Sequence, residues 1–202
     1  MSYVAIVDYG AGNIKSVEKA LNRLGADTLV TDSPKDISKA SRVILPGVGA
    51  FGDAMERLDR QGLSDIIREV CSSDTPFLGI CLGLQLLYGT SDESPGAKGL
   101  GILKGSIRKL PDSELKVPHI GWNSLELSGD GRLFKGVPDG SFVYFVHSYY
   151  LTSEDSGAVK ARTVYGEVID ASVEYGNVFA CQFHPEKSSE QGLLMLENFL
   201  RI

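Results

Sequence analysis

The pattern of apolar and polar positions divides the chain near residue 88. Before that point, short apolar runs alternate with segments in which apolar residues recur every three or four positions. The runs predict buried strands and the periodic segments predict amphipathic helices. The expected strands are residues 3–8, 27–31, 42–45 and 76–80. The expected helices are residues 14–24, 53–61, 63–71 and 82–88, with a further short helix after Ser33-Pro34. This alternation indicates a parallel sheet with helices on both faces and a site at the carboxyl ends of its strands.

Beyond residue 88 the pattern changes to shorter, strand-like pieces. Residues 90–99 are polar and predict a loop, and Gly176-Asn177 predicts a hairpin turn. The expected strands are residues 101–103, 106–110, 124–127, 142–146, 159–165, 171–175 and 178–183. Ser188 and Gln191 have the spacing of a capping box at the start of a last helix that ends near Leu200, and Asn13 is a candidate cap for the first helix. We therefore expect one α/β domain over residues 1–202, with a mostly parallel or mixed central sheet.

One cysteine lies at the junction of an expected strand and an expected helix. Cys81 is the centre of G-I-C-L-G, with Gly79 and Gly83 on either side. Small neighbours are needed where a strand turns directly into a helix, because the central residue is held in a strained conformation. The amino end of the helix favours a thiolate there. A buried structural cysteine is the alternative, since a lone cysteine is usually one.

Two glycine-rich turns follow the first and third expected strands. Residues 46–52 read P-G-V-G-A-F-G and would present backbone N–H groups, including those of Val48 and Gly49, at the same sheet edge as Cys81. An ordinary flexible loop is the alternative. The earlier G-A-G at residues 10–12 does not make a dinucleotide fingerprint, because Lys15 stands where the third glycine is required.

A nucleophilic thiol needs a base, and the chain has three histidines. His184 directly follows the last expected strand, in H-P-E, where Glu186 can hold its ring in one tautomer. His119 and His147 could be structural or could line a pocket. Cys81, His184 and the glycine-rich turn together have the parts of a covalent acyl-transfer site.

Composition narrows the class of protein. The net charge is −6 with scattered basic residues, which argues against nucleic acid as a main partner. The three cysteines form neither a C-x-x-C pair nor a metal-binding spacing, so we expect no metal and a reducing, cytoplasmic setting. No apolar run approaches the length of a membrane span.

These motifs resemble a known family. G-I-C-L-G-L-Q, P-G-V-G and the distant H-P-E are similar to the triad-type, class I glutamine amidotransferases. Within that class, P-G-V-G-A-F-G, V-P-H-I-G-W-N, Y-F-V-H-S-Y and Q-F-H-P-E-K-S resemble the glutaminase subunit of imidazole glycerol phosphate synthase. The resemblance runs from Tyr3 to the last helix and implies a flavodoxin-like fold without a cofactor.

The resemblance implies a catalytic role for each part of the site. Cys81 would attack the carboxamide of glutamine, His184 would move the proton to the departing ammonia, and Glu186 would orient His184. The oxyanion would be held by N–H groups of Leu82 and of Val48 or Gly49. Substrate would be bound by Gln85 and Glu93, with backbone of Ser148 and Tyr149.

The resemblance also implies a partner. Ammonia would pass to a separate (β/α)8-barrel cyclase subunit, in a heterodimer that makes imidazole glycerol phosphate and an aminoimidazole carboxamide ribotide for histidine biosynthesis. Trp122, the single tryptophan, is expected at that interface. Asn13, Tyr144 and Lys187 are further interface candidates.

Three other functions stay open at this point. The chain could be the glutaminase of another pathway, such as pyridoxal phosphate or anthranilate synthesis, although those lack the G-W-N and V-H-S-Y context. It could be a cysteine hydrolase or peptidase with the same sheet. It could also be a binding module without activity, which an intact Cys81, His184 and Glu186 disfavour.

Overall fold

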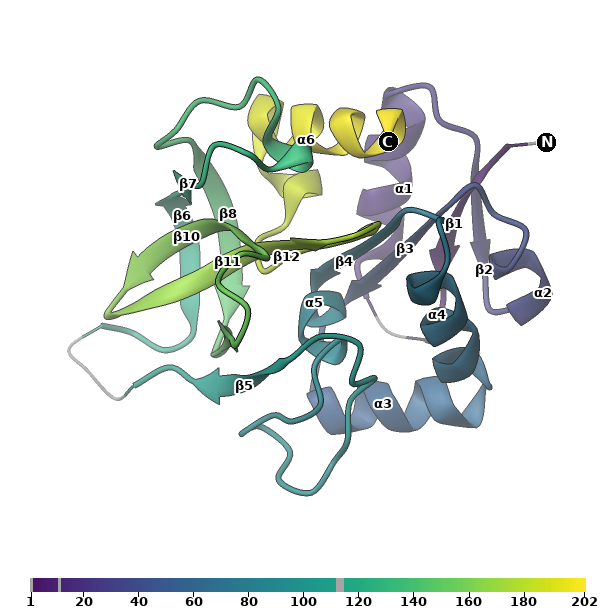
Figure 1. Ribbon diagram of the computed structural model, residues 1–202, viewed down its shortest axis with the longest axis horizontal. Helices are drawn as coiled ribbons and strands as arrows, with labels where there is room; N and C mark the ends of the chain where they lie inside the picture. The colour runs from purple at the N-terminus through teal and green to yellow at the C-terminus, as the bar shows by residue number, and fades with distance from the viewer. Residues whose placement is uncertain (1, 11, 112–114) are drawn as a thin grey trace.

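The computed structural model describes residues 2–10, 12–111 and 115–202. Its centre is an eight-stranded sheet with the order β2-β1-β3-β4-β12-β11-β10-β7 (Figure 1). The strands of this sheet are β1 (Val4–Val7), β2 (Thr28–Thr31), β3 (Arg42–Gly47), β4 (Phe77–Cys81), β7 (Glu126–Leu127), β10 (Val159–Tyr165), β11 (Glu167–Tyr175) and β12 (Val178–Cys181). β2, β1, β3, β4 and β12 run parallel, and the strands beyond β12 are antiparallel. The expected mixed sheet is therefore confirmed.

Two small antiparallel sheets and the helices surround this centre. β5 (Gly105–Lys109) pairs with β9 (Tyr149–Ser153), and β6 (His119–Ser124) pairs with β8 (Phe142–His147). The helices are α1 (Ile14–Arg23), α2 (Pro34–Ile37), α3 (Phe51–Arg60), α4 (Leu63–Ser72), α5 (Leu82–Leu86) and α6 (Ser189–Arg201), with 3-10 turns η1 (Arg132–Phe134) and η2 (Pro185–Lys187).

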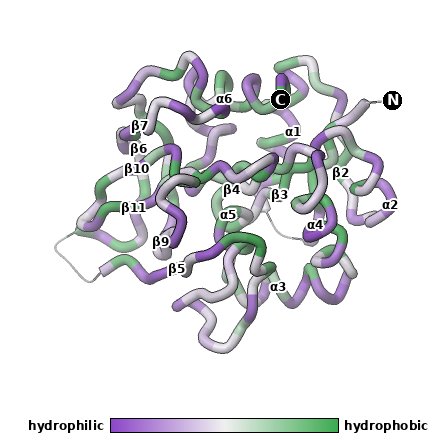
Figure 2. The backbone as a smooth tube through the Cα atoms, viewed as in Figure 1, coloured by the Kyte–Doolittle hydropathy of each residue, from purple (hydrophilic) through white to green (hydrophobic). Residues whose placement is uncertain are grey.

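The core consists of two apolar layers, one on each face of the sheet. Because side chains alternate along a strand, Val4 and Ile6 of β1 pack with α1 and α6, while Ala5 and Val7 pack with α3 and α4. Figure 1 shows α1 and α6 on one side of the sheet and α3 and α4 on the other. Figure 2 shows hydrophobic residues along the central strands β3 and β4 and along α5, and hydrophilic residues mainly in peripheral segments such as α2 and β9. Burial of the inner strands on both faces explains why they read as continuous apolar runs.

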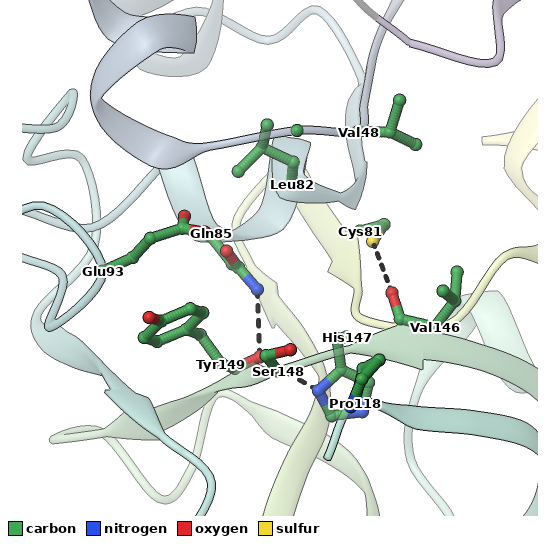
Figure 3. A pocket seen from close by; sticks show the side chains of 11 residues that line it. Val48, Cys81, Leu82, Gln85, Glu93, Pro118, Val146, His147, Ser148 and Tyr149 are labelled. Atoms are coloured by element: carbon green, nitrogen blue, oxygen red, sulfur yellow. Dashed lines mark hydrogen bonds between the residues drawn. The ribbon is translucent and has the colours of Figure 1, made fainter.

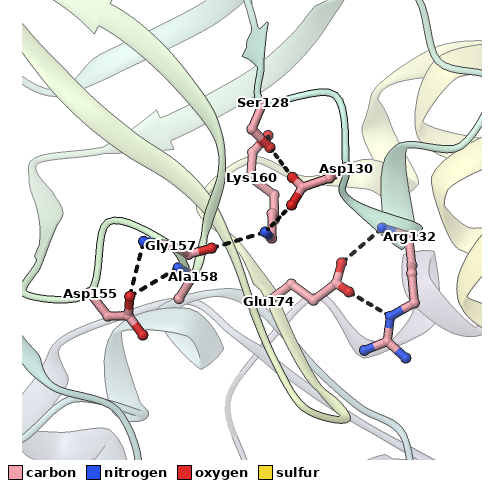
Figure 4. A network of polar contacts seen from close by, with 8 residues as sticks. All are labelled: Ser128, Asp130, Arg132, Asp155, Gly157, Ala158, Lys160 and Glu174. Atoms are coloured by element: carbon pink, nitrogen blue, oxygen red, sulfur yellow. Dashed lines mark hydrogen bonds and ion pairs between the residues drawn. The ribbon is translucent and has the colours of Figure 1, made fainter.

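Polar contacts support the antiparallel edge of the sheet (Figure 4). The Arg132 Nε lies 2.5 Å from a Glu174 carboxylate oxygen, and Lys160 Nζ lies 2.8 Å from Asp130. The Glu174 carboxylate also accepts the Arg132 backbone N–H at 2.9 Å. These contacts join η1 and the turn before it to β10 and β11.

Several expectations about local structure are wrong. Residues 101–103 form no strand, because the N–H groups of Leu100 and Ile102 instead bind the carbonyls of Leu86 and Leu87 at 2.8 Å. The same contacts close the end of α5 at Leu86, although the apolar run continues to residue 88.

The two expected caps are also wrong in detail. Ser188 makes no capping hydrogen bond to α6. Its hydroxyl donates to the His184 carbonyl at 2.6 Å and accepts the Tyr144 N–H at 3.0 Å. Asn13 precedes α1, but its side chain faces Ser16 Oγ and Glu186 rather than a backbone N–H of the helix.

Strands β6 and β9 were not expected from the residue pattern. β6 contains Gly121 and follows Pro118, so its apolar alternation is short. The expected strand over residues 124–127 is divided at Leu125 between β6 and β7. β11 begins at Glu167, four residues before the expected start at 171. The Gly176-Asn177 hairpin between β11 and β12 is confirmed.

Candidate active site

Cys81 lies where β4 ends and α5 begins, in the sharp turn that its sequence predicts. Its backbone has φ 55° and ψ −107°, a conformation that costs free energy for any residue other than glycine. A Cβ on Gly83 would overlap the Leu45 carbonyl oxygen, and one on Gly79 would lie 2.7 Å from the Gly83 carbonyl oxygen. Glycine at both positions is therefore what lets β4 and α5 meet at Cys81.

His184 and Glu186 form a buried pair after β12. The Nδ1 of His184 lies 2.8 Å from Oε1 of Glu186, and both side chains are almost completely shielded from solvent. Since a carboxylate only accepts, this contact assigns the proton to Nδ1 and leaves Nε2 to face the reaction. Within the described chain, Nε2 makes no hydrogen bond of good geometry.

The surroundings of His184 favour its charged form. Burial of the ring lowers its pKa, but interactions with Cys81 and Glu186 outweigh burial and raise the pKa to about 9. An imidazolium held close to the sulfur stabilises a thiolate. The pair therefore has the electrostatics of a cysteine nucleophile with its base.

The sulfur of Cys81 lies at the wall of a cavity of about 290 Å³ (Figure 3). The Sγ faces the carbonyl oxygen of Val146 at 3.9 Å and the side-chain amide of Gln182 at 3.6 Å. The cavity is lined by Val48, Gly49, Cys81, Leu82, Gln85, Glu93, Pro118, Val146, His147, Ser148 and Tyr149. All the residues expected to hold the oxyanion and the substrate thus line one cavity.

Two of these polar residues are held by the protein itself. The Gln85 amide donates to Gln182 Oε1 at 3.0 Å and to the Tyr149 carbonyl at 3.1 Å. Glu93 accepts the Phe51 N–H, at the start of α3, at 2.7 Å. Both side chains therefore enter the cavity in fixed orientations.

Sequence reasoning missed Gln182, Pro118 and Val146. Gln182 is completely buried and joins Cys81 to Gln85. The sequence feature that could have identified Gln182 is its position as a polar residue in the otherwise apolar run before His184. Pro118 and Val146 carry no reactive group, and only the tertiary structure brings them to the cavity.

Two of the four interface candidates, Trp122 and Tyr144, lie on one largely exposed apolar surface. In the β6–β8 pair, Trp122 is opposite Tyr144, and Ile120 is opposite Val146. Trp122 is 50% exposed and Ile120 is 60% exposed. We call the outward-facing residues Ile120, Trp122, Phe142, Tyr144 and Val146 the β6–β8 face.

This face adjoins the catalytic pair. The Lys187 Nζ lies 5.7 Å from the centre of the Tyr144 ring, whose edge meets Trp122 at 6.2 Å between centroids. The Tyr144 carbonyl accepts the His184 N–H at 2.9 Å. Asn13 also lies close to the catalytic pair, since its Nδ2 is 3.4 Å from Glu186 Oε1.

The described residues offer neither a metal-binding cluster nor a membrane-spanning helix. No group of three or more His, Cys, Asp or Glu side chains there is arranged to hold a metal ion. None of the helices in residues 2–10, 12–111 and 115–202 combines the length and apolar character that crossing a membrane requires.

Comparison with known proteins gives consistent matches. The family profile described as Glutamine amidotransferase class-I matches residues 5–202. The chain is 51% identical to imidazole glycerol phosphate synthase subunit HisH of Moorella thermoacetica over 199 residues, which cover 98% of this chain and 94% of that one. It is 50% identical to the subunit of the same name of Bacillus cereus strain G9842, over 97% of this chain and 93% of that one.

Solved structures give the same fold at lower identity. The structure of PurLQS from Thermotoga maritima superposes with a TM-score of 0.77 at 22% identity, covering 99% of this chain and 98% of that one. At this identity the similarity shows the fold alone.

Proposed function

Since the chain belongs to the class-I glutamine amidotransferase family, we propose that it hydrolyses glutamine to glutamate and ammonia with Cys81 as the nucleophile. The observation that carries the proposal is the position of Cys81, at a strained strand–helix turn beside the buried His184–Glu186 pair and on the wall of a cavity. By its relatives, the chain is the glutaminase subunit of imidazole glycerol phosphate synthase, in histidine biosynthesis.

The first half of the reaction forms a thioester. The sulfur of Cys81 attacks the carboxamide carbon of glutamine, and its proton resides on Nε2 of His184. As the C–N bond breaks, His184 gives that proton to the departing ammonia. Glu186 keeps the ring in the tautomer that presents Nε2, and it stabilises the imidazolium.

The oxyanion formed in this step needs hydrogen-bond donors. The N–H of Leu82, directly after the nucleophile, and the N–H of Val48 or Gly49 border the same cavity. Each such donor is worth about 3 kcal/mol of transition-state stabilisation. Water then attacks the thioester, His184 takes its proton, and glutamate leaves as Cys81 is restored.

The amino-acid end of glutamine lies toward Gln85 and Glu93. Glu93 supplies a carboxylate for the α-ammonium group. The amide nitrogen of Gln85 donates to Tyr149 and Gln182, which fixes the side chain and leaves its Oε1 to accept a hydrogen bond from the substrate. The backbone of Ser148 and Tyr149 meets the α-carboxylate. Leu82 and Val146 close the apolar part of the cavity around the methylene groups.

Ammonia made here needs a protected route, which a partner subunit supplies. We place a (β/α)8-barrel cyclase subunit on the β6–β8 face, as one half of a heterodimer. A surface with Trp122 and Ile120 half or more exposed has the aromatic and apolar character of an interface hot spot. Lys187 and Asn13, which are close to Glu186, form the edge of this interface nearest the catalytic pair.

We assign residues 1–202 to one glutamine amidotransferase domain that works in the cytoplasm without a cofactor. The family profile spans residues 5–202. The free thiols of Cys71, Cys81 and Cys181 fit a reducing compartment.

The test is a measurement of glutamate release from glutamine, with the chain alone and with the cyclase subunit and its nucleotide substrate. We expect release that depends on Cys81 and that rises with the partner. Absence of glutamate in the complete mixture would contradict the proposal. Hydrolysis of peptides or esters in its place would favour the cysteine hydrolase alternative.

A further inference from the structure

Two buried histidines lie directly behind the substrate cavity. The Nδ1 of His119 is 3.0 Å from Nε2 of His147, and Nδ1 of His147 is 2.9 Å from the carbonyl oxygen of Tyr149. Both rings are buried, and His147 also lines the cavity. Neither ring takes part in the reaction described above, so the pair needs a separate explanation.

The contacts assign one protonation pattern to the pair. A carbonyl oxygen only accepts hydrogen bonds, so Nδ1 of His147 carries a proton. In the neutral ring, Nε2 of His147 then accepts, and Nδ1 of His119 donates to it. Burial lowers the pKa of His119 to about 4, and burial together with the neighbouring His119 lowers the pKa of His147 to about 3. Both rings are therefore neutral at physiological pH, and their donors point toward Tyr149.

Aromatic stacking fixes the outer ring of the pair. The His119 ring lies 3.9 Å from the ring of Tyr165 and 4.9 Å from that of Phe145, nearly parallel to both. His119 therefore has little freedom to turn, and its Nδ1–H stays aimed at His147.

The carbonyl at the end of this chain is held from two sides. The Tyr149 oxygen accepts from Nδ1 of His147 and from Nε2 of Gln85, at 2.9 and 3.1 Å (Figure 3). A carbonyl has two lone pairs, so both are used. The Tyr149 carbonyl is therefore not an acceptor for substrate, and its direction is set by the two side chains.

The pairing of β5 with β9 shows that the direction of the Tyr149 carbonyl also sets the direction of the Tyr149 N–H. Tyr149 is paired with Lys109 of β5, and the adjacent Leu110 N–H donates to the Ser148 carbonyl at 2.9 Å. In an antiparallel pair, a residue in this position turns both its N–H and its C=O away from the partner strand. Lys109 does the same, since its N–H donates to Asp92 at 3.2 Å. The Tyr149 N–H thus faces the same side as its carbonyl, toward the cavity.

We propose that His119 and His147 are positioning residues for the substrate, which hold the Tyr149 backbone so that its N–H meets the α-carboxylate of glutamine. The proposal rests on the proposed glutaminase function. The three histidines then have different roles. His184 acts on the reacting bond, and His119 and His147 act on the opposite end of the substrate. Loss of the pair should therefore raise the KM for glutamine more than it lowers kcat.

The first test compares two variants of His147 in the complex with the cyclase subunit. In His147→Asn, the side-chain amide can take the place of Nδ1 and still donate to Tyr149. In His147→Leu, that donor is lost at similar volume. We expect His147→Leu to raise the KM for glutamine by about tenfold, with kcat changed by less than about threefold, and His147→Asn to restore most of the KM.

Labelling separates substrate positioning from thiol chemistry. An electrophilic glutamine analogue that keeps the amino-acid head should label Cys81 about tenfold more slowly in His147→Leu, by the same argument. Iodoacetamide lacks that head and should react with Cys81 at nearly the wild-type rate. Equal KM values for the Leu and Asn variants, or a loss confined to kcat, would overturn the positioning role. A wild-type complex without glutaminase activity would instead refute the proposed function.

The second test needs no variant. Long-range ¹H–¹⁵N spectra of the histidines in the wild-type complex report which ring nitrogen carries the proton. We expect both His119 and His147 to remain neutral, with the proton on Nδ1, from about pH 8 down to about pH 5. A proton on Nε2 of His147, or titration of either ring near the usual value of about 6.5, would overturn the assignment.

Discussion

The carboxylate of Glu186 lies 2.8 Å from Nδ1 of His184, and neither side chain reaches solvent. Glu186 therefore acts on the reaction only through the orientation and charge of His184. His184→Ala should reduce kcat by several orders of magnitude, because it removes the base. Glu186→Gln should cost less, since packing and a remaining polar contact keep part of the orientation. Steady-state glutamate release in the complex measures both.

His147→Ala is the control for this comparison. It removes a ring that lines the same cavity but does not face the leaving group, so acylation of Cys81 should persist at saturating glutamine. A loss of kcat as large as that of His184→Ala would show that the two histidines have been assigned the wrong roles.

Cys81 should be the one cysteine that an electrophilic glutamine analogue labels. Burial raises the pKa of Cys71 to about 12 and raises that of Cys181 well above its usual range, so neither forms a thiolate readily. Cys81→Ala should abolish glutamine hydrolysis while the fold and partner binding persist. Peptide mass spectrometry locates the label, and modification of Cys71 or Cys181 at a comparable rate would contradict the assignment.

Gly83 should be essential for folding as well as for the site. Gly83→Ala would drive a methyl group into the Leu45 carbonyl, where backbone on both sides is buried. We expect a loss of about 2–4 kcal/mol in the free energy of unfolding. Gly89→Ala is the matched control, because a Cβ there meets no atom within 4 Å. Urea denaturation compares the two, and equal stability of both variants would be inconsistent with the close approach of α5 to β3.

The raised pKa of His184 should make stability depend on pH. The folded protein binds this proton more tightly than the unfolded chain, with a pKa of about 9 against the usual 6.5. The stabilisation is thus complete below about pH 6.5 and is lost as the pH rises through about 9. Urea unfolding of wild type and His184→Asn should show a difference that shrinks from about pH 6 to pH 10. A difference that does not vary with pH, or one that grows, would contradict the shift.

Glutaminase activity should depend on the partner subunit because of the direction of a backbone carbonyl next to Cys81. In the β3–β4 pair, Val43 N–H donates to the Pro76 carbonyl at 2.9 Å, and Gly47 is paired with Cys81. Hydrogen bonds alternate by two residues along a strand, so this register directs the Gly47 carbonyl toward the Leu82 N–H. A carbonyl in that position competes with the oxyanion.

We therefore expect the isolated subunit to be a poor glutaminase. Partner binding would favour a turned Gly47–Val48 peptide, and one oxyanion donor gained is worth about 3 kcal/mol, or roughly a hundredfold in rate. Trp122→Ala should weaken assembly or activation without changing the labelling of Cys81. Glutaminase rates with and without the cyclase subunit and its ligand provide the measurement. A full rate in the isolated subunit would remove the basis for this coupling.

The sequence by itself determined the parts of this protein that depend on local order. Continuous apolar runs predicted β1, β3 and β4, because these strands are buried on both faces. The glycines beside Cys81 predicted the sharp turn, because a Cβ at Gly83 would meet β3 and a Cβ at Gly79 would meet α5. The H-P-E order placed Glu186 within reach of His184, since the two residues are only two positions apart in the chain.

Only the tertiary structure decided which distant groups share a contact. Ser188 and Asn13 have the sequence positions of helix caps. In the folded chain, however, the Ser188 hydroxyl bonds to the backbone of His184 and Tyr144, and the Asn13 side chain bonds to Glu186, so neither side chain caps its helix. His119 and His147 are 28 positions apart, and neither the length nor the charge of the segment between them predicts that β6 and β8 pair in this register. A short run of alternating apolar and polar residues does not by itself specify where a strand pairs. The pairing depends on the surface that the strand covers, and that surface exists only once the chain has folded.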